Sequence, residues 1–226
     1  MPTLRQECCV PDFSDELTAK REARVTLLAA RRALTATQRA DAAASVVAEL
    51  VTLVRRLRPR RMTGYVPVGA EPGGPDLPEA LRAALPDDAE LLLPVLRDDL
   101  DLDWAAYTGA GALVAAGRGM REPAGPRRGE SAVAGAELVV VPALAVDRRG
   151  LRLGRGGGSY DRALARVPRA TLTVALLHDG ELVEALPAQP HDRPVRAVIT
   201  PSGGLRTLGD APGVDPSTSA GRTRVP

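Results

Sequence analysis

The stretch of sequence that decides the fold runs from Leu138 to Asp161. It reads Leu-Val-Val-Val-Pro-Ala-Leu-Ala-Val-Asp-Arg-Arg-Gly-Leu-Arg-Leu-Gly-Arg-Gly-Gly-Gly-Ser-Tyr-Asp. The continuous apolar run at its start is typical of a strand buried on both faces. A turn at Asp147–Gly150 follows, then a glycine-rich loop, then a helix that starts near Tyr160. Strand, loop and helix in direct succession indicate an α/β fold.

The same alternation extends outward along the chain. Further short apolar runs between turn residues predict strands at 62–66, 91–94, 172–177 and 197–199. Helical stretches predict helices at 15–34, 36–57, 75–85 and 160–167, the second of them opened by a Thr35/Gln38 capping box. The segments 100–107 and 111–114 form either a hairpin or short edge strands. We therefore expect a mostly parallel central sheet flanked by helices in three layers, Rossmann-like in outline.

Composition limits the classes of protein that remain. The 226 residues carry 30 basic and 28 acidic side chains, well mixed, so no broad electrostatic field for nucleic acid is expected. No window approaches a membrane span, and the adjacent pair Cys8–Cys9 suits a reducing compartment. We expect a cytoplasmic monomer with a single domain at 15–201. A leader at 1–14 and a Gly/Ser/Thr/Pro-rich tail at 202–226 are expected to be disordered.

The glycine-rich loop has the chemistry of an anion site. Gly154, Gly156, Gly157 and Gly158 allow positive φ angles and let backbone N–H groups approach phosphate oxygens. The flanking arginines add charge-assisted donors, and the following helix start adds its dipole. A flexible surface loop is the alternative explanation of a glycine run. The motif matches neither the dinucleotide-binding pattern nor the P-loop, which argues against both folds.

Several motifs together resemble one family. Residues 142–147 and 152–161 are similar to the signature of the 5-formyltetrahydrofolate cyclo-ligases, also called methenyltetrahydrofolate synthetases. Four more matches follow the family order over about residues 17–201: Lys20-Arg-Glu-Ala-Arg24, Gly64–Glu71, Arg118–Pro123, and His191–Val195 with Ile199-Thr200. The resemblance implies a three-layer fold of the NagB/RpiA-like type. It also implies closure of 5-formyltetrahydrofolate to 5,10-methenyltetrahydrofolate, with ATP as co-substrate and Mg²⁺ as cofactor.

The resemblance also implies a role for individual residues. ATP would be bound by Lys20, Arg24, Arg152, Leu153, Gly154, Arg155, Gly156, Gly157, Gly158, Ser159 and Tyr160. Arg155 and Lys20, the only lysine of the chain, would be catalytic. Folate would contact Val66, Glu71, Arg155 and Ser159, and Mg²⁺ would be held by Asp161 and Asp192. Taken singly, Lys20 is explained equally well as a solvated helix charge, Glu71 as an exposed loop residue, and Asp161 as a helix N-terminal carboxylate.

One position departs from the family pattern. Where the family usually has two tyrosines before the aspartate, this chain has Ser159-Tyr160. The missing ring removes a stacking surface worth roughly 0.5–1.5 kcal/mol, which would weaken folate binding about tenfold without abolishing it. With aromatic residues at only 2%, this leaves a second hypothesis, a non-catalytic or altered-specificity relative that binds nucleotide or folate. His178 and His191 show no metal-ligand spacing, and we expect them at surface or loop positions without a catalytic role.

Overall fold

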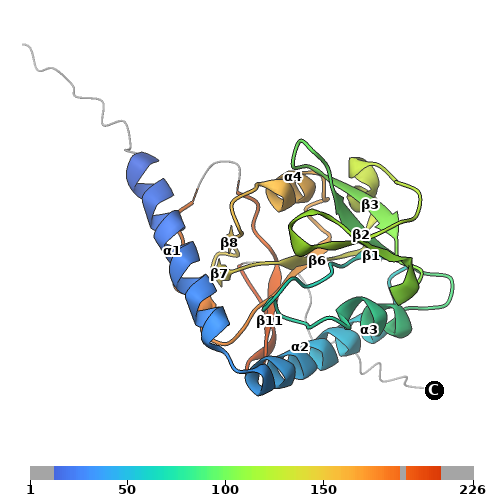
Figure 1. Ribbon diagram of the computed structural model, residues 1–226, viewed down its shortest axis with the longest axis horizontal. Helices are drawn as coiled ribbons and strands as arrows, with labels where there is room; N and C mark the ends of the chain where they lie inside the picture. The colour runs from blue at the N-terminus through green and yellow to red at the C-terminus, as the bar shows by residue number, and fades with distance from the viewer. Residues whose placement is uncertain (1–12, 189–191, 210–226) are drawn as a thin grey trace, which may run out of the picture.

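The chain folds around a seven-stranded sheet with the order β12-β11-β9-β6-β1-β2-β3 (Figure 1). The computed structural model describes residues 13–188 and 192–209. The five inner strands are parallel, and the two edge strands are antiparallel to their neighbours. Their bounds are β1 Arg61–Thr63, β2 Glu90–Leu96, β3 Leu102–Ala106, β6 Leu138–Pro142, β9 Leu172–Leu176, β11 Ala197–Thr200 and β12 Gly204–Thr207. The expected mostly parallel sheet is confirmed.

Helices cover both faces of this sheet. On one face lie α2 (Ala36–Leu57) and α3 (Leu77–Ala84), and on the other lie α4 (Ser159–Ala165) and the 3₁₀ helix η3 (Glu130–Gly135) (Figure 1). Alternate residues of β6 enter the two cores: Leu138 and Val140 pack with α2 and α3, whereas Val139 and Val141 pack with α4. A strand buried on both faces needs the unbroken apolar run that its sequence shows.

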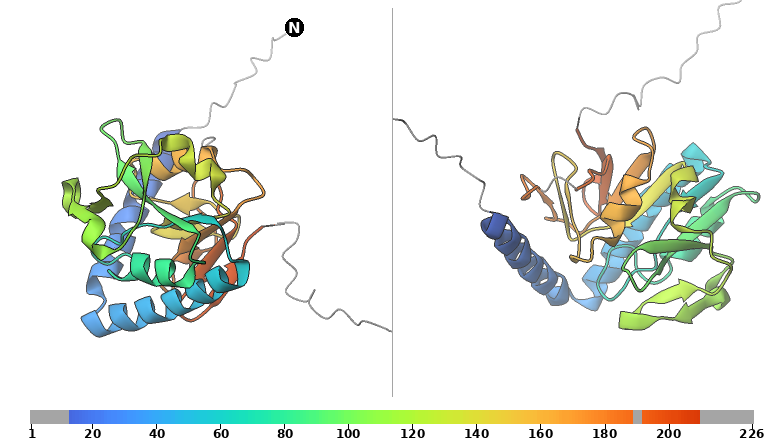
Figure 2. Two further views of the ribbon diagram at one scale, coloured as in Figure 1. Left: turned by 90° about the vertical axis from the view of Figure 1, so that its right-hand side faces the viewer. Right: turned by 90° about the horizontal axis from the view of Figure 1, so that it is seen from above.

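The N-terminal helix α1 (Phe13–Ala33) stands apart from these layers and meets α2 at an angle (Figure 2). The capping box expected for α2 is present, because the Thr35 hydroxyl accepts from the Gln38 amide and the Gln38 side chain accepts from the Thr35 amide. No helix in the described part of the chain is long and apolar enough to cross a membrane.

Smaller elements complete the fold. A three-stranded sheet of β7 (Ala145–Asp147), β8 (Arg152–Leu153) and β10 (Leu182–Val183) carries the glycine-rich loop at the end of β8. A hairpin joins β4 (Leu113–Ala115) to β5 (Arg121–Pro123), with the short 3₁₀ turns η1 (Ala110–Ala112) and η2 (Gly117–Gly119) beside it. The segment expected at 100–107 thus forms the edge strand β3, and the segment at 111–114 pairs elsewhere.

The expectation for the C-terminal tail was wrong at its beginning. Residues 204–207 form β12, which pairs with β11 in antiparallel register from Ala197↔Thr207 to Thr200↔Gly204. A tight turn at 201–203 makes this pairing local, so few apolar side chains are needed to order the strand. The expected leader lies almost wholly outside the described residues, as do residues 210–226 and His191.

Strand order places a candidate site. From β1 the chain proceeds through α3 to β2 on one side, whereas β6, β9 and β11 follow one another on the other side. The order therefore reverses between β1 and β6. In open α/β sheets, ligands bind beyond the carboxyl ends of the strands at such a reversal.

Candidate functional site

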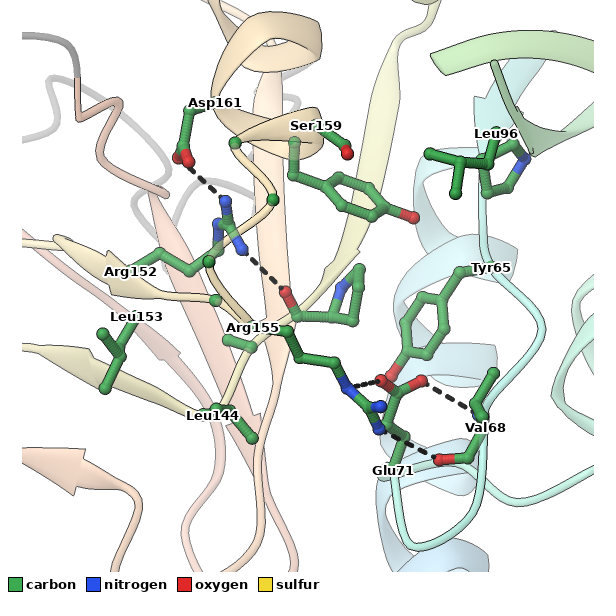
Figure 3. Close-up of a pocket in the computed structure, with 18 of the residues that line it drawn as sticks. Tyr65, Val68, Glu71, Leu96, Leu144, Arg152, Leu153, Arg155, Ser159 and Asp161 are labelled. Carbon is green, nitrogen blue, oxygen red and sulfur yellow. Dashed lines mark hydrogen bonds and ion pairs between the residues drawn. The ribbon is translucent and has the colours of Figure 1, made fainter. Parts of the chain in front are cut away.

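A pocket of about 460 Å³ lies at this reversal (Figure 3). Its floor is formed by the segments that leave β1 and β6, including Tyr65, Val66 and Pro142–Leu144. α1 closes one side, the glycine-rich loop another, and the β4–β5 hairpin a third. A pocket of this volume suits a small-molecule ligand.

Every residue predicted for the site lines this one pocket. They come from α1, from the segment after β1, from β8, the glycine-rich loop and the start of α4, and from the segment before β11: Lys20, Arg24, Val66, Glu71, Arg152, Leu153, Gly154, Arg155, Gly156, Gly157, Gly158, Ser159, Tyr160, Asp161 and Asp192. The structure thus brings together residues up to 172 positions apart in sequence. Their individual roles remain predictions.

The glycine loop, Gly154–Gly158, has the backbone that the sequence predicted. Gly156 and Gly158 have φ angles of 100° and 69°, which side chains other than glycine rarely adopt. Arg24 on α1 donates from Nε to the Gly154 carbonyl at 2.9 Å, and Arg162 on α4 donates to the Gly157 carbonyl at 3.1 Å. The loop is therefore held through its carbonyl groups.

Lys20 and Arg24 share one face of α1, as their spacing predicted. The Lys20 ammonium lies 2.8 Å from an Asp192 carboxylate oxygen, and the two side chains are only 7% and 9% exposed. The alternative explanation of Lys20 as a solvated helix charge is therefore wrong. Its ammonium group lies in the wall of the pocket, next to the Asp192 carboxylate.

Arg152, predicted to contribute to ATP binding, lines the pocket and is also hydrogen-bonded within the protein. Its guanidinium donates to Asp161 at 2.8 Å and to the Pro142 carbonyl at 3.2 Å, and it lies over the ring of Tyr160. With a side chain only 4% exposed, Arg152 ties the start of α4 to the end of β6. Because the glycine loop lies between Arg152 and Asp161, this ion pair joins the two ends of the loop.

Glu71 and Arg155 face one another across the pocket (Figure 3). Glu71 Oε1 lies 3.1 Å from Arg155 Nε, and Glu71 Oε2 accepts from the Val68 amide at 2.9 Å. Glu71 is 10% exposed and Arg155 53% exposed, so the glutamate is part of the wall while the arginine reaches over the opening. An exposed loop position for Glu71 is thereby excluded.

Two tyrosines lie near this pair. Burial, together with the charge of Glu71, raises the pKa of Tyr65 and of Tyr160 well above the ordinary value, so both phenols stay protonated. The Tyr65 hydroxyl donates to the Pro72 carbonyl at 2.9 Å. The Tyr160 hydroxyl has no hydrogen-bond partner among residues 13–188 and 192–209, although it is buried, and it lines the pocket.

The sequence did not predict the buried ion pair between Arg31 and Glu181 beside the pocket. Arg31 on α1 forms two hydrogen bonds with Glu181, at 2.7 and 2.8 Å, and Glu181 accepts from the His178 amide at 2.7 Å. His178 lies in the loop after β9, within the expected surface or loop positions, but it is buried rather than exposed. The one available signal was that Arg31 follows Arg24 by seven residues and so lies on the same helical face.

Glu122, whose role the sequence left undefined, anchors the β4–β5 hairpin. Its carboxylate accepts from the Leu96 amide at 2.9 Å, at the end of β2. The anchored hairpin presents Arg118, Met120 and Arg121 to the pocket.

A metal site formed by protein ligands alone is not present in the described ranges, where no three His, Cys, Asp or Glu side chains cluster. Asp161 and Asp192 both line the pocket, each paired with a cationic side chain. Mg²⁺ is commonly held by one or two carboxylates together with substrate phosphates. Two aspartates beside a phosphate-type loop fit that pattern.

The fold and the site together define an α/β enzyme whose pocket combines a glycine-rich anion loop with a buried carboxylate. The model of the 5-formyltetrahydrofolate cyclo-ligase family matches residues 16–201, and the chain belongs to that family. A 5-formyltetrahydrofolate cyclo-ligase of Mycolicibacterium smegmatis is 40% identical over 195 residues, covering 84% of this chain and 97% of that protein.

Solved structures agree on the architecture. The 5,10-methenyltetrahydrofolate synthetase of Aquifex aeolicus superposes with a TM-score of 0.70 at 28% identity, covering 87% of this chain and 96% of that one. A 5,10-methenyltetrahydrofolate synthetase of Mycoplasma pneumoniae superposes with a TM-score of 0.62, covering 79% and 96%, and at 16% identity it supports the fold alone.

Proposed function

We propose that this chain converts 5-formyltetrahydrofolate to 5,10-methenyltetrahydrofolate, using ATP and Mg²⁺ and releasing ADP and phosphate. The observation that carries the proposal is the convergence of Lys20, Arg24, the glycine loop and Glu71 on one pocket at the reversal of strand order. Membership of the cyclo-ligase family supplies the substrate class. The contacts within the pocket support the division of roles.

The chemistry requires activation of the formyl oxygen, because an amide-like oxygen is a poor leaving group. The γ-phosphoryl group of ATP is transferred to that oxygen. N10 of the folate then attacks the formyl carbon and loses its proton, and the carbon–oxygen bond breaks so that the oxygen departs with phosphate. Catalysis of this kind depends on positioning and on neutralising charge, and it requires no protein nucleophile.

The pocket offers groups for both ligands. Lys20, Arg24 and the glycine loop supply charge and backbone N–H groups for the phosphates. Glu71 supplies a carboxylate that can accept two hydrogen bonds from the amino-pyrimidine edge of the pterin. Arg155 lies between these two regions and is the group best placed to stabilise charge on the transferring phosphoryl.

Mg²⁺, when bound, would neutralise phosphate charge at the site of transfer. Asp161 and Asp192 are the residues that would hold it, because their oxygens are hard ligands in the wall that carries the phosphate loop. Both already pair with cationic side chains of the same pocket, Arg152 and Lys20, so these four charges would regroup around the ion.

The test is to mix the purified protein with 5-formyltetrahydrofolate, ATP and Mg²⁺ and to follow the methenyl chromophore. We expect a signal that requires all three additions. Absence of the chromophore, with tight ATP binding retained, would favour the second candidate, a relative with lost or altered chemistry. Ser159 is the observation behind that candidate, because it lines the pocket where the family has an aromatic ring.

A further inference from the structure

Glu71 is held at its carboxylate, and the carbonyl groups of the residues on either side of it also accept hydrogen bonds. The carbonyl of Ala70 accepts from His178 Nε2 at 3.0 Å, and the carbonyl of Pro72 accepts from the Tyr65 hydroxyl at 2.9 Å. A carbonyl oxygen can only accept, so Nε2 of His178 carries the proton. Two donors thus fix the backbone immediately before and immediately after the glutamate.

Both donors are themselves buried. His178 is 7% exposed and Tyr65 is 2% exposed, so water competes little for either hydrogen bond. His178 follows β9 and Tyr65 follows β1, the two strands on either side of β6, so both donors lie at the carboxyl edge of the sheet. Losing either donor would leave a carbonyl beside Glu71 without its partner.

The position of His178 is set in turn by Arg31 and Glu181. Glu181 Oε2 accepts from the His178 amide, and Arg31 donates to both oxygens of Glu181. Arg31 also donates to the Ala143 carbonyl just after β6. A buried ion pair contributes little net stability compared with apolar packing, but it defines one geometry for the groups that it connects.

We propose that His178 and Tyr65 are positioning residues that hold Glu71 in the orientation that binds the folate pterin. The inference rests on the proposed function of Glu71. The polar atom of each side chain contacts a backbone carbonyl, so each acts on the orientation of Glu71. Their effect is on folate recognition, while the glycine loop and its cations are left intact.

Two amide substitutions separate the donor from the bulk of the ring. His178→Gln keeps an N–H donor near the place of Nε2, whereas His178→Asn offers the same amide one carbon short of the Ala70 carbonyl. We expect His178→Asn to raise the KM for 5-formyltetrahydrofolate about tenfold, the effect of losing one buried hydrogen bond, and His178→Gln to restore most of it. The KM for ATP and kcat at saturating folate should change less than about twofold.

Tyr65→Phe tests the other side of Glu71 and keeps the inference testable if the histidine variants do not fold. We expect it also to raise the folate KM with little change in the ATP KM. Tyr107→Phe is the matched control. Tyr107 is also a buried tyrosine, and its hydroxyl donates to Glu79 at 3.0 Å, but it does not line the pocket. It should leave both KM values unchanged, whatever it does to thermal unfolding.

A double-mutant cycle with Glu71→Gln decides whether the donors act through the glutamate. If they do, His178→Asn and Tyr65→Phe lose most of their effect on the folate KM in the Glu71→Gln background. Full additivity, or equal changes in the KM values of folate and ATP, would overturn the inference. An unchanged folate KM in Glu71→Gln alone would overturn the proposed role of Glu71, which is a separate outcome.

Discussion

The two walls of the pocket are built in opposite ways. The glycine loop is largely exposed. Arg24 and Arg162 donate to two of its carbonyl groups, and its Arg155 side chain pairs with Glu71. The Glu71 segment, Val68–Pro72, is held by buried donors that lie up to 108 residues away in sequence. On the proposed assignment, the difference matches what each wall would recognise. A phosphate needs accessible backbone N–H groups, whereas one planar ring edge needs a carboxylate with a single orientation.

The largest effect should come from Arg155, which touches both walls. Arg155→Ala removes the cation of the glycine loop that pairs with Glu71, and on its proposed role we expect kcat to fall by about 100- to 1000-fold, as for loss of one donor to a transition-state charge. Folding should be unaffected, because the side chain is half exposed. Steady-state methenyl formation and thermal unfolding measure the two effects.

The control for Arg155 is Arg148→Ala, which removes an exposed arginine paired with exposed Glu184. This variant should behave like the wild type. A kcat within about threefold of the wild type for Arg155→Ala would exclude Arg155 from the chemistry. The two walls would then share no catalytic side chain.

Arg24→Gln should weaken ATP binding at the glycine loop without weakening folate binding. It removes the charge-assisted hydrogen bond to the Gly154 carbonyl and one positive charge, so the KM for ATP should rise about tenfold or more while the folate KM stays near the wild-type value. Arg21→Gln, an exposed residue on the same helix, is the matched control. Equal losses for both ligands would show that the walls are not independent.

Ser159→Tyr should strengthen folate binding from the side of the glycine loop, which Ser159 directly follows. Restoring an aromatic ring at the first position of α4 should lower the folate KM by about two- to tenfold through stacking. Ser159→Ala is the control, because it changes the polar group without adding a ring. A higher folate KM in Ser159→Tyr would mean that the pocket of this chain is shaped without space for the family's ring.

The smallest effect on activity should come from Asp101→Asn, which acts on the support of the glycine loop. Asp101 accepts two hydrogen bonds from Arg166 at the end of α4, and these hold the pKa of its carboxyl below the ordinary value of 3.8. Because the folded-state pKa is lowered, the interaction stabilises the protein above about pH 4 and is lost as the pH falls through the folded-state value.

We therefore expect Asp101→Asn to lower the free energy of unfolding at neutral pH by about 1–3 kcal/mol. The difference from the wild type should shrink in acid, since the wild-type carboxyl is then protonated as well. Urea unfolding at several pH values measures this. A difference independent of pH would exclude the ionised carboxylate as its source.

The contrast between the walls also explains how much could be predicted from the sequence. β6, the glycine loop and the start of α4 follow one another closely along the chain, so their order in sequence predicts their arrangement in space. Helical periodicity predicts that Lys20 and Arg24 share one helix face, but their place in the site, like the folate role of Glu71, came only with the family resemblance. The bond from His178 to Ala70 and the Arg31–Glu181 pair depend on which strands are neighbours, and nothing local in the sequence specifies this.

β12 and the contact of Glu122 could not be predicted for a different reason. β12 has a weak apolar pattern and forms because a tight turn returns the chain alongside β11, so pairing outweighs composition. Glu122 is one of many acidic residues until the hairpin folds back and its carboxylate meets the Leu96 amide. Such contacts are decided by tertiary structure after the central sheet has formed.

The ion pair between Arg155 and Glu71 has a consequence for how the two ligands influence each other. On the proposed assignment, a pterin that pairs with Glu71 must displace Arg155, and the released guanidinium lies in the loop that receives the phosphates. Each ligand then removes a cost that the other would otherwise bear. Thermodynamic linkage requires the effect to be mutual, so ATP and folate would bind with positive cooperativity, each lowering the dissociation constant of the other by the same factor.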